Sequence, residues 1–113
     1  MRVHSMKLTQ LPFTLIAHGS KTIESRLYDE KRQAIELGDT IIFSLLEDET
    51  RILTTQVVGL LRYANFHDLF TCNDPNKFGG STAMELETQI AQFYSDALQQ
   101  KYGVIGIELR LIG

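Results

Sequence analysis

The sequence predicts one small α+β domain over residues 1–113, built as a partly open, mixed or antiparallel β-barrel with two or three helices. Two observations predict this class. Segments rich in β-branched or alternating apolar side chains recur along the chain, about six in all, and they do not alternate with helices as βαβ units do. Two of these segments are joined by a short acidic turn, which favours antiparallel pairing through a hairpin.

The first third of the chain predicts two strands and a helix. Residues 1–8 are typical of a short strand, and residues 9–18 carry an apolar helical face with Thr9 as a plausible N-cap. Gly19 is a suitable stop for that helix. A strand is expected next, with side chains alternating between two faces: Lys21, Ile23, Ser25 and Leu27 on one, and Thr22, Glu24, Arg26 and Tyr28 on the other. The second face is polar, so it is either solvated or lines a groove.

The middle of the chain predicts a hairpin. A charged connection ends at the turn signal Gly38-Asp39 and leads into a buried strand over residues 40–46. Residues 47–50 form the acidic hairpin tip. The long strand that returns over residues 51–63 contains Gly59, which indicates a bulge or bend.

The last third predicts helices followed by a closing strand. A short helix is expected over residues 65–70, followed by a loop over residues 71–81. Thr82 and Glu85 form a capping-box pattern, and apolar residues at helical spacing, Phe93 among them, make one face of this helix, which extends as far as Gly103. Residues 104–112 then predict the last strand.

The composition is that of an ordinary globular protein. Hydrophobic residues make up 43% of the chain and charged residues 22%, and there is one cysteine, Cys72. A single cysteine forms no internal disulfide and suits a reducing compartment. The sequence shows neither a secretory leader nor a run of roughly 20 apolar residues. We therefore expect a cytoplasmic protein that does not bind membranes.

The distribution of charge is uneven. The net charge of −3 argues against a protein that coats nucleic acid through bulk electrostatics. Residues 1–32, however, hold six of the 11 Lys and Arg residues and only three acidic residues. An anion site is therefore to be sought in the first third of the chain, although ordinary scatter of charge would give the same pattern.

Three motifs resemble those of the ASCH domain family. The segment Gly19-Ser20-Lys21-Thr22-Ile23-Glu24-Ser25-Arg26 is similar to its Gly-x-Lys-x-x-Glu-x-Arg signature. Residues 38–43 follow at the expected distance, and residues 102–107 resemble the closing strand of the family. The resemblance covers nearly the whole chain and is weakest in the Asp74–Gly80 loop. It implies a PUA-like barrel whose cleft, floored by the lysine-containing strand, holds RNA or a nucleotide.

The resemblance also implies a set of binding residues: Lys21, Thr22, Glu24 and Arg26, with Ser44 and Tyr63 beside them. A carboxylate can accept hydrogen bonds from an exocyclic amine, while an ammonium or a guanidinium can bind a phosphate or a base carbonyl. The competing interpretation is that Glu24 and Arg26 form an ion pair and satisfy only each other. Phe78 beside Gly79-Gly80 is either a stacking ring on a flap or part of an ordinary loop.

Whether the protein is an enzyme stays open in the sequence. Some small bacterial relatives are acetylcytidine amidohydrolases, in which a Lys and a Thr of this strand act with a downstream Glu. Lys21 matches the Lys, but Glu24 stands where those enzymes have the Thr, and the downstream Glu has no certain equivalent. Amide hydrolysis by Lys21 with Glu24 as proton carrier is therefore the alternative hypothesis, beside a ribonuclease or a protein-interaction domain.

The expected partner is a short or single-stranded RNA, a nucleoside or a nucleotide. We expect no cofactor and no metal, because His4, His18, His67 and Cys72 lack the spacing of a ligand set.

Overall fold

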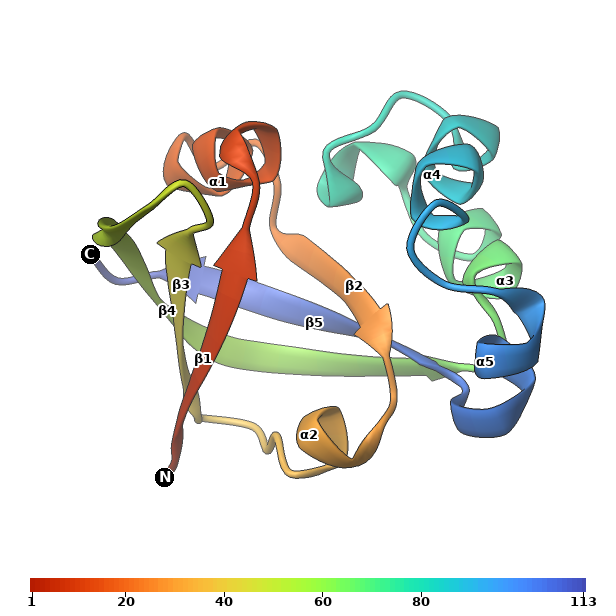
Figure 1. The fold of residues 1–113 in the computed structure, drawn as a ribbon, viewed down its shortest axis with the longest axis horizontal. Helices are drawn as coiled ribbons and strands as arrows, with labels where there is room; N and C mark the ends of the chain where they lie inside the picture. The colour runs from red at the N-terminus through yellow and green to blue at the C-terminus, as the bar shows by residue number, and fades with distance from the viewer.

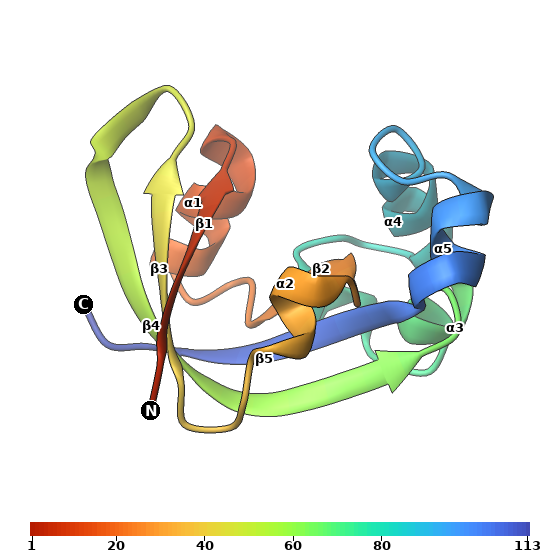
Figure 2. The same cartoon turned by 60° about the horizontal axis from the view of Figure 1, so that its bottom comes forward.

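The computed structural model of the protein describes residues 1–113 and shows one curled, five-stranded sheet. The strands are β1 (Val3–Leu8), β2 (Ile23–Leu27), β3 (Thr40–Leu45), β4 (Asp48–Tyr63) and β5 (Val104–Leu111). Their order in the sheet is β1-β3-β4-β5-β2, with β1 parallel to β3 and every other neighbouring pair antiparallel. The sheet curls into a half-barrel (Figures 1 and 2). The predicted α+β class and partly open barrel are confirmed, with five strands.

Short helices flank the two ends of this half-barrel. They are α1 (Gln10–Ala17), α2 (Glu30–Gln33), α3 (Phe66–Thr71), α4 (Ala83–Ile90), α5 (Asp96–Tyr102) and the 3₁₀ turn η1 (Pro75–Phe78). Helix α1 stands at one end of the sheet and α3 to α5 gather at the other (Figure 1). None of these helices is long and apolar enough to cross a membrane.

The buried apolar residues form two clusters, one on each side of β2. The first lies within the curl of the sheet under α1 and includes Phe13, Ile41 and Phe43. The second joins β2 to α3 and α4 and includes Phe66 and Phe70. Burying such side chains stabilises the fold by about 1.5–3 kcal/mol each. Helix α1 packs on the first cluster and α4 on the second, and a cleft lies between the two helices.

The prediction of one helix from Thr82 to Gly103 is wrong, because the chain breaks into α4 and α5. The break has a local cause: the hydroxyl of Ser95 accepts a hydrogen bond from the amide of Leu98, so Ser95 caps a new helix. The ring of Tyr94 stacks on Phe66 at a centroid distance of 5.7 Å. Its neighbour Phe93 is left 70% exposed, although its spacing had placed it on the apolar face.

Two local predictions of turn and cap chemistry are confirmed. Thr82 caps α4 by accepting from the amide of Glu85 at 3.1 Å. The pairing of β4 with β5 shifts register between Val57 and Gly59, which is the predicted bulge. A Cβ atom at Gly59 would stand 2.6 Å from Oε1 of Glu108, so this position accepts only glycine without rearrangement. The hairpin tip is Leu46–Glu47, since Asp48 already belongs to β4.

Asp39 ties the start of the sheet together through a buried carboxylate. It accepts hydrogen bonds from the backbone amides of Arg2 and Glu36, each at 3.0 Å, and lies 2.8 Å from Nε2 of His4. The bonds from Arg2, His4 and Glu36, in that order, hold the pKa of the Asp39 carboxyl well below its ordinary value. The carboxylate thereby fixes β1 beside the turn that precedes β3.

Replacing Asp39 with asparagine should lower the free energy of unfolding at neutral pH by about 2 kcal/mol, because hydrogen bonds to a charged acceptor are lost. The folded-state pKa lies below the unfolded value of 3.8. The stabilisation is therefore complete above about pH 4 and is lost as the pH falls towards the folded-state pKa. Urea unfolding of both proteins at a series of pH values measures the difference, which should shrink in acid. A difference that stays constant with pH would contradict this assignment.

Candidate functional site

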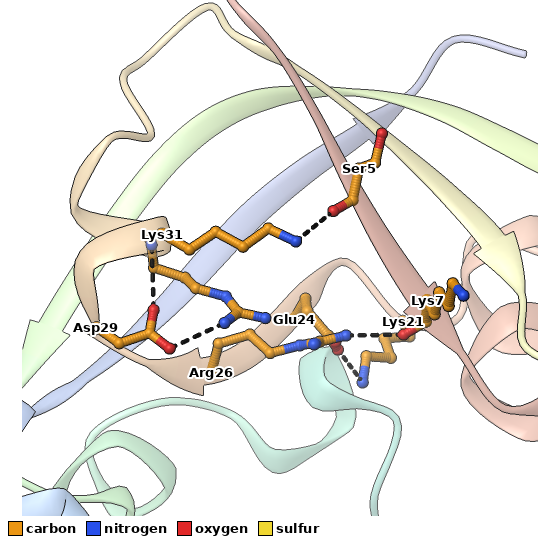
Figure 3. Close-up of polar contacts among 8 residues, drawn as sticks. Ser5, Lys7, Lys21, Glu24, Arg26, Asp29 and Lys31 are labelled. Atoms are coloured by element: carbon orange, nitrogen blue, oxygen red, sulfur yellow. Dashed lines mark hydrogen bonds and ion pairs between the residues drawn. The ribbon is translucent and has the colours of Figure 1, made fainter.

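Three charged side chains of the signature segment meet at the entrance to β2. Nζ of Lys21 lies 2.9 Å from Oε1 of Glu24, and Nε of Arg26 donates to Oε2 of the same carboxylate at 2.8 Å (Figure 3). The three side chains are only 12%, 5% and 15% exposed, respectively. They form a nearly buried row of cation, anion and cation, which we call the polar floor.

The electrostatics of the polar floor favour the charged forms. Burial alone would raise the pKa of the Glu24 carboxyl, but the charges of Lys21 and Arg26 and their hydrogen bonds hold it below its ordinary value. Burial would likewise lower the pKa of Arg26, yet the Glu24 carboxylate, with a contribution from the Tyr94 phenol, raises it. With all three groups ionised, the floor carries one net positive charge.

The backbone around the floor is fixed from several sides. Gly19 adopts a left-handed φ of 76°, which lets the chain turn after α1 so that the amide of Lys21 bonds to the carbonyl of Leu15 at 3.1 Å. Gly79, also left-handed, comes close to the Lys21 side chain: a Cβ there would lie 3.4 Å from Cδ of Lys21. Nη2 of Arg26 donates to the carbonyl of Lys7 in β1 at 3.0 Å.

The polar floor opens into a cleft of about 540 Å³ between α1 and α4. Its apolar lining comes from Leu11, Pro12 and Leu15 on one side and from Phe78, Leu86, Ile90, Phe93 and Tyr94 on the other. The polar side chains Glu85, Gln89 and Gln92 lie among the residues of the second side. Leu11 and Phe93 are 65% and 70% exposed at its rim. Such a cleft suits a small planar ligand, whose polar edge would meet the floor and whose faces would meet the apolar walls.

The structure brings only some of the predicted site residues into this cleft. Lys21, Glu24 and Arg26 line it, whereas Thr22, Ser44 and Tyr63 do not. Thr22 is exposed, and its backbone bonds to Lys77 and Leu109; the hydroxyl of Tyr63 accepts from the side-chain Nδ2 of Asn73 at 3.3 Å. Ser44 lies within β3, paired with β1 and β4.

The strand alternation expected for residues 21–28 is wrong at its start. It placed Lys21 and Glu24 on opposite faces, but β2 begins only at Ile23. Lys21 lies in the turn before the strand, where strand phase does not apply, and its side chain reaches Glu24.

Sequence reasoning missed the contribution of α4 to the cleft. Phe93 was assigned to a core face because its spacing matched a continuous helix, and only the break after Ile90 brings it to the rim. The interpretation of Phe78 as an exposed stacking ring is wrong. It is 3% exposed and packs edge-on against Phe70 at a centroid distance of 5.0 Å.

A second hollow, of about 670 Å³, lies near α3 and α5 and is the larger of the two. It contains a pair between His67 and Glu87, with 2.8 Å between Nδ1 and Oε1, but this His67 side chain is 65% exposed. One of its polar groups, the amide oxygen of Gln99, is already used by the backbone of Phe66. The cleft with buried charges is therefore the stronger candidate.

A curled half-barrel with an antiparallel β4–β5 pair, a parallel β1–β3 pair and helices at both ends is an α+β arrangement consistent with the PUA-like fold. The sequence profile described as "ASCH domain" matches residues 6–112. The chain belongs to the ASCH domain family.

Solved structures support the same assignment. The chain is similar to hypothetical protein PH0355, with 35% identity over 99% of this chain and 100% of that one and a TM-score of 0.86. It is also similar to protein PF0455 from Pyrococcus furiosus, with 29% identity, 97% coverage of both chains and a TM-score of 0.75. The S128A mutant of ZmASCH from Zymomonas mobilis shares the fold at 14% identity, covering 96% of this chain and 67% of that one, with a TM-score of 0.60. No curated protein matches the sequence.

Replacing Glu24 with glutamine should lower the free energy of unfolding by about 3 kcal/mol, because two nearly buried cations lose their shared counter-charge. Glu49→Gln is the matched control: it also removes one negative charge from a pair with a lysine, Lys7, but both side chains are more than half exposed. Chemical denaturation should show a large loss for the first variant and almost none for the second. Equal losses would show that the floor is no more than a solvated ion pair.

Proposed function

We propose that this protein binds RNA or a nucleotide in the cleft between α1 and α4, with Lys21, Glu24 and Arg26 as the polar recognition surface. The observation that carries the proposal is the nearly buried floor of three charges facing a cleft with apolar walls. Membership of the ASCH domain family supports it, because PUA-like domains are generally associated with RNA.

The chemistry of the floor suits the edge of a nucleobase. The Glu24 carboxylate accepts hydrogen bonds, so it can receive an exocyclic amine, while Lys21 and Arg26 donate to a ring carbonyl or a phosphate. The exposed ring of Phe93 and the side chain of Leu11 offer apolar surface for a base face.

The size of the cleft limits the ligand. A volume of about 540 Å³ lies in the range of small-molecule sites and holds a nucleotide or one unstacked base of a strand. Thr22, Ser44 and Tyr63 lie outside this lining and would contact only the parts of a longer ligand that extend beyond it.

The proposal is tested by titrating ¹⁵N-labelled protein with cytidine, mononucleotides and a short single-stranded RNA. Ligand should shift the amides of Lys21, Glu24 and Arg26, and Lys21→Met should weaken binding by about tenfold, since one charge-assisted hydrogen bond is lost. Lys101→Met removes the same charge from α5, outside the cleft lining, and should leave the affinity unchanged. If no ligand moves the floor residues at millimolar concentration, the proposal is wrong.

A second candidate function, hydrolysis of an amide on a modified nucleoside, is favoured by one contact: the 2.9 Å between Nζ of Lys21 and Oε1 of Glu24. Passage of the Lys21 proton to Glu24 would give a neutral amine that removes a proton from the attacking water. The Glu24 carboxyl would then protonate the leaving nitrogen, and the products are a carboxylic acid and an amine. The lowered pKa of Glu24 opposes the first step.

Incubation with acetylcytidine separates the two candidates, because only hydrolysis converts the acetyl signal in a proton NMR spectrum to that of free acetate. If the protein is an amidohydrolase, Lys21→Arg should abolish acetate release while preserving the ion pair with Glu24 and the fold. Binding of acetylcytidine without any release of acetate would support the binding function and contradict the enzymatic one.

A further inference from the structure

Cationic side chains join the edge strand β1 to the other edge strand, β2, and to the helix that follows it, α2. These strands stand at opposite ends of the sheet order and share no backbone ladder. Nζ of Lys31 donates to the carbonyl of Ser5 at 2.8 Å, and Nη2 of Arg26 donates to the carbonyl of Lys7 at 3.0 Å (Figure 3). The gap between the edges is therefore spanned by two positive charges.

A third cation, Arg32, stands beside these two. The pKa of Lys31 is lowered by partial burial and by the positive charges of Arg32 and Arg26, so both guanidinium groups lie close enough to Lys31 to repel its charge. Five of the six basic residues of the N-terminal third gather around the polar floor and this gap: Lys7, Lys21, Arg26, Lys31 and Arg32.

The two carboxylates that contact these cations, Asp29 and Glu24, already have hydrogen-bond partners. Asp29 accepts from the backbone amide of Arg32 at 3.2 Å and from its Nη1 at 3.0 Å. Glu24 is shared between Arg26 and Lys21. With Glu30 in the first turn of α2, three carboxylates stand against four cations, so this region carries one net positive charge.

One donor in this group has no acceptor. Nε of Arg32 is buried, and it is the single buried side-chain nitrogen or oxygen in the protein without a hydrogen-bond partner. A buried donor without a partner costs about 1–3 kcal/mol, so folded proteins rarely leave one unpaired without a reason. An oxyanion that enters this gap and displaces the atoms covering Nε is the kind of group that would satisfy it.

We propose that Arg26, Lys31 and Arg32 form a subsite for a phosphate group, so that the ligand of the cleft is a phosphorylated nucleoside. This inference rests on the proposed binding function and adds the class of ligand: a nucleotide, or a nucleotide unit of an RNA strand. Arg26 links the two parts, because its Nε belongs to the polar floor while its Nη2 lies at the gap. A base in the cleft would place its phosphate towards α2, where guanidinium groups bind phosphate oxygens in a forked geometry.

The experiment compares the dissociation constants of cytidine, 5′-CMP, 3′-CMP and the dinucleotide CpC by calorimetry at low salt. The phosphorylated ligands should bind about tenfold more tightly than cytidine, and added salt should reduce this ratio. Lys31→Gln and Arg32→Lys should each bring the ratio close to one. Arg32→Lys keeps the charge but removes Nε, and Lys31 is exposed, so both variants should fold.

Lys101→Gln is the matched control, because it removes one positive charge on α5 and should leave the ratio unchanged. A second measurement tests the phosphate subsite with a ligand that has no nucleobase. Inorganic phosphate should shift the ¹H–¹⁵N signal of Arg32 Nε, which has no acceptor in the free protein. Tighter binding of 5′-CMP or 3′-CMP than of CpC would indicate a free nucleotide as the ligand. Tighter binding of CpC would indicate the phosphodiester of an RNA strand.

The outcomes separate this inference from the proposed function. Equal affinity for cytidine and the phosphorylated ligands, with shifts on the polar floor, would overturn the subsite and leave the binding function standing. A tenfold preference that survives Lys31→Gln and Arg32→Lys would place the phosphate elsewhere and overturn the assignment of these residues. If no nucleoside or nucleotide binds, both proposals fail.

Discussion

The sharing of one nearly buried carboxylate by two cations is the interaction on which the functional half of this structure depends. Glu24 stands between Lys21 and Arg26, and each partner comes from a different local setting: Lys21 from a turn and Arg26 from a strand. An ion pair taken out of water is stabilising only when its geometry is good and its remaining hydrogen bonds are made. Here Arg26 also bonds to β1, so the same side chain that completes the ion pair holds the two edges of the half-barrel together.

The same arrangement explains why an acidic protein can offer a cationic binding surface. The net charge is −3, but the acidic residues lie mostly in the later part of the chain. Folding brings four basic residues of the N-terminal third, Lys21, Arg26, Lys31 and Arg32, towards the gap between β1 and β2. Under the proposed function, a positive region with an apolar cleft beside it suits a small anionic ligand with a planar group better than a long nucleic acid duplex, which would meet the negative remainder of the surface.

Much of the fold could be predicted from the sequence, because its signals are local. Thr82 caps a helix with its own hydroxyl, Gly59 allows a bulge where a side chain would collide with Glu108, and the apolar alternation of β3 places one face of that strand in the core. The single helix expected after Thr82 failed because the spacing of apolar residues does not reveal a break. Ser95 can cap a helix or lie within one; in the structure it caps α5, and the ring of Tyr94 before it stacks on Phe66.

The sequence by itself determined the class of fold, the signature segment and the three residues Lys21, Glu24 and Arg26, since these depend on residue type and short spacing. Only the tertiary structure decided what surrounds them. It brought Lys21 to Glu24 across a turn, moved Phe93 from an expected core face to the rim of a cleft, and gathered Lys31 and Arg32 beside Arg26. The physical reason is that both features depend on contacts between segments far apart in the chain. Such contacts set the direction of a side chain that lies outside a regular strand, and they also close the gap between two edge strands.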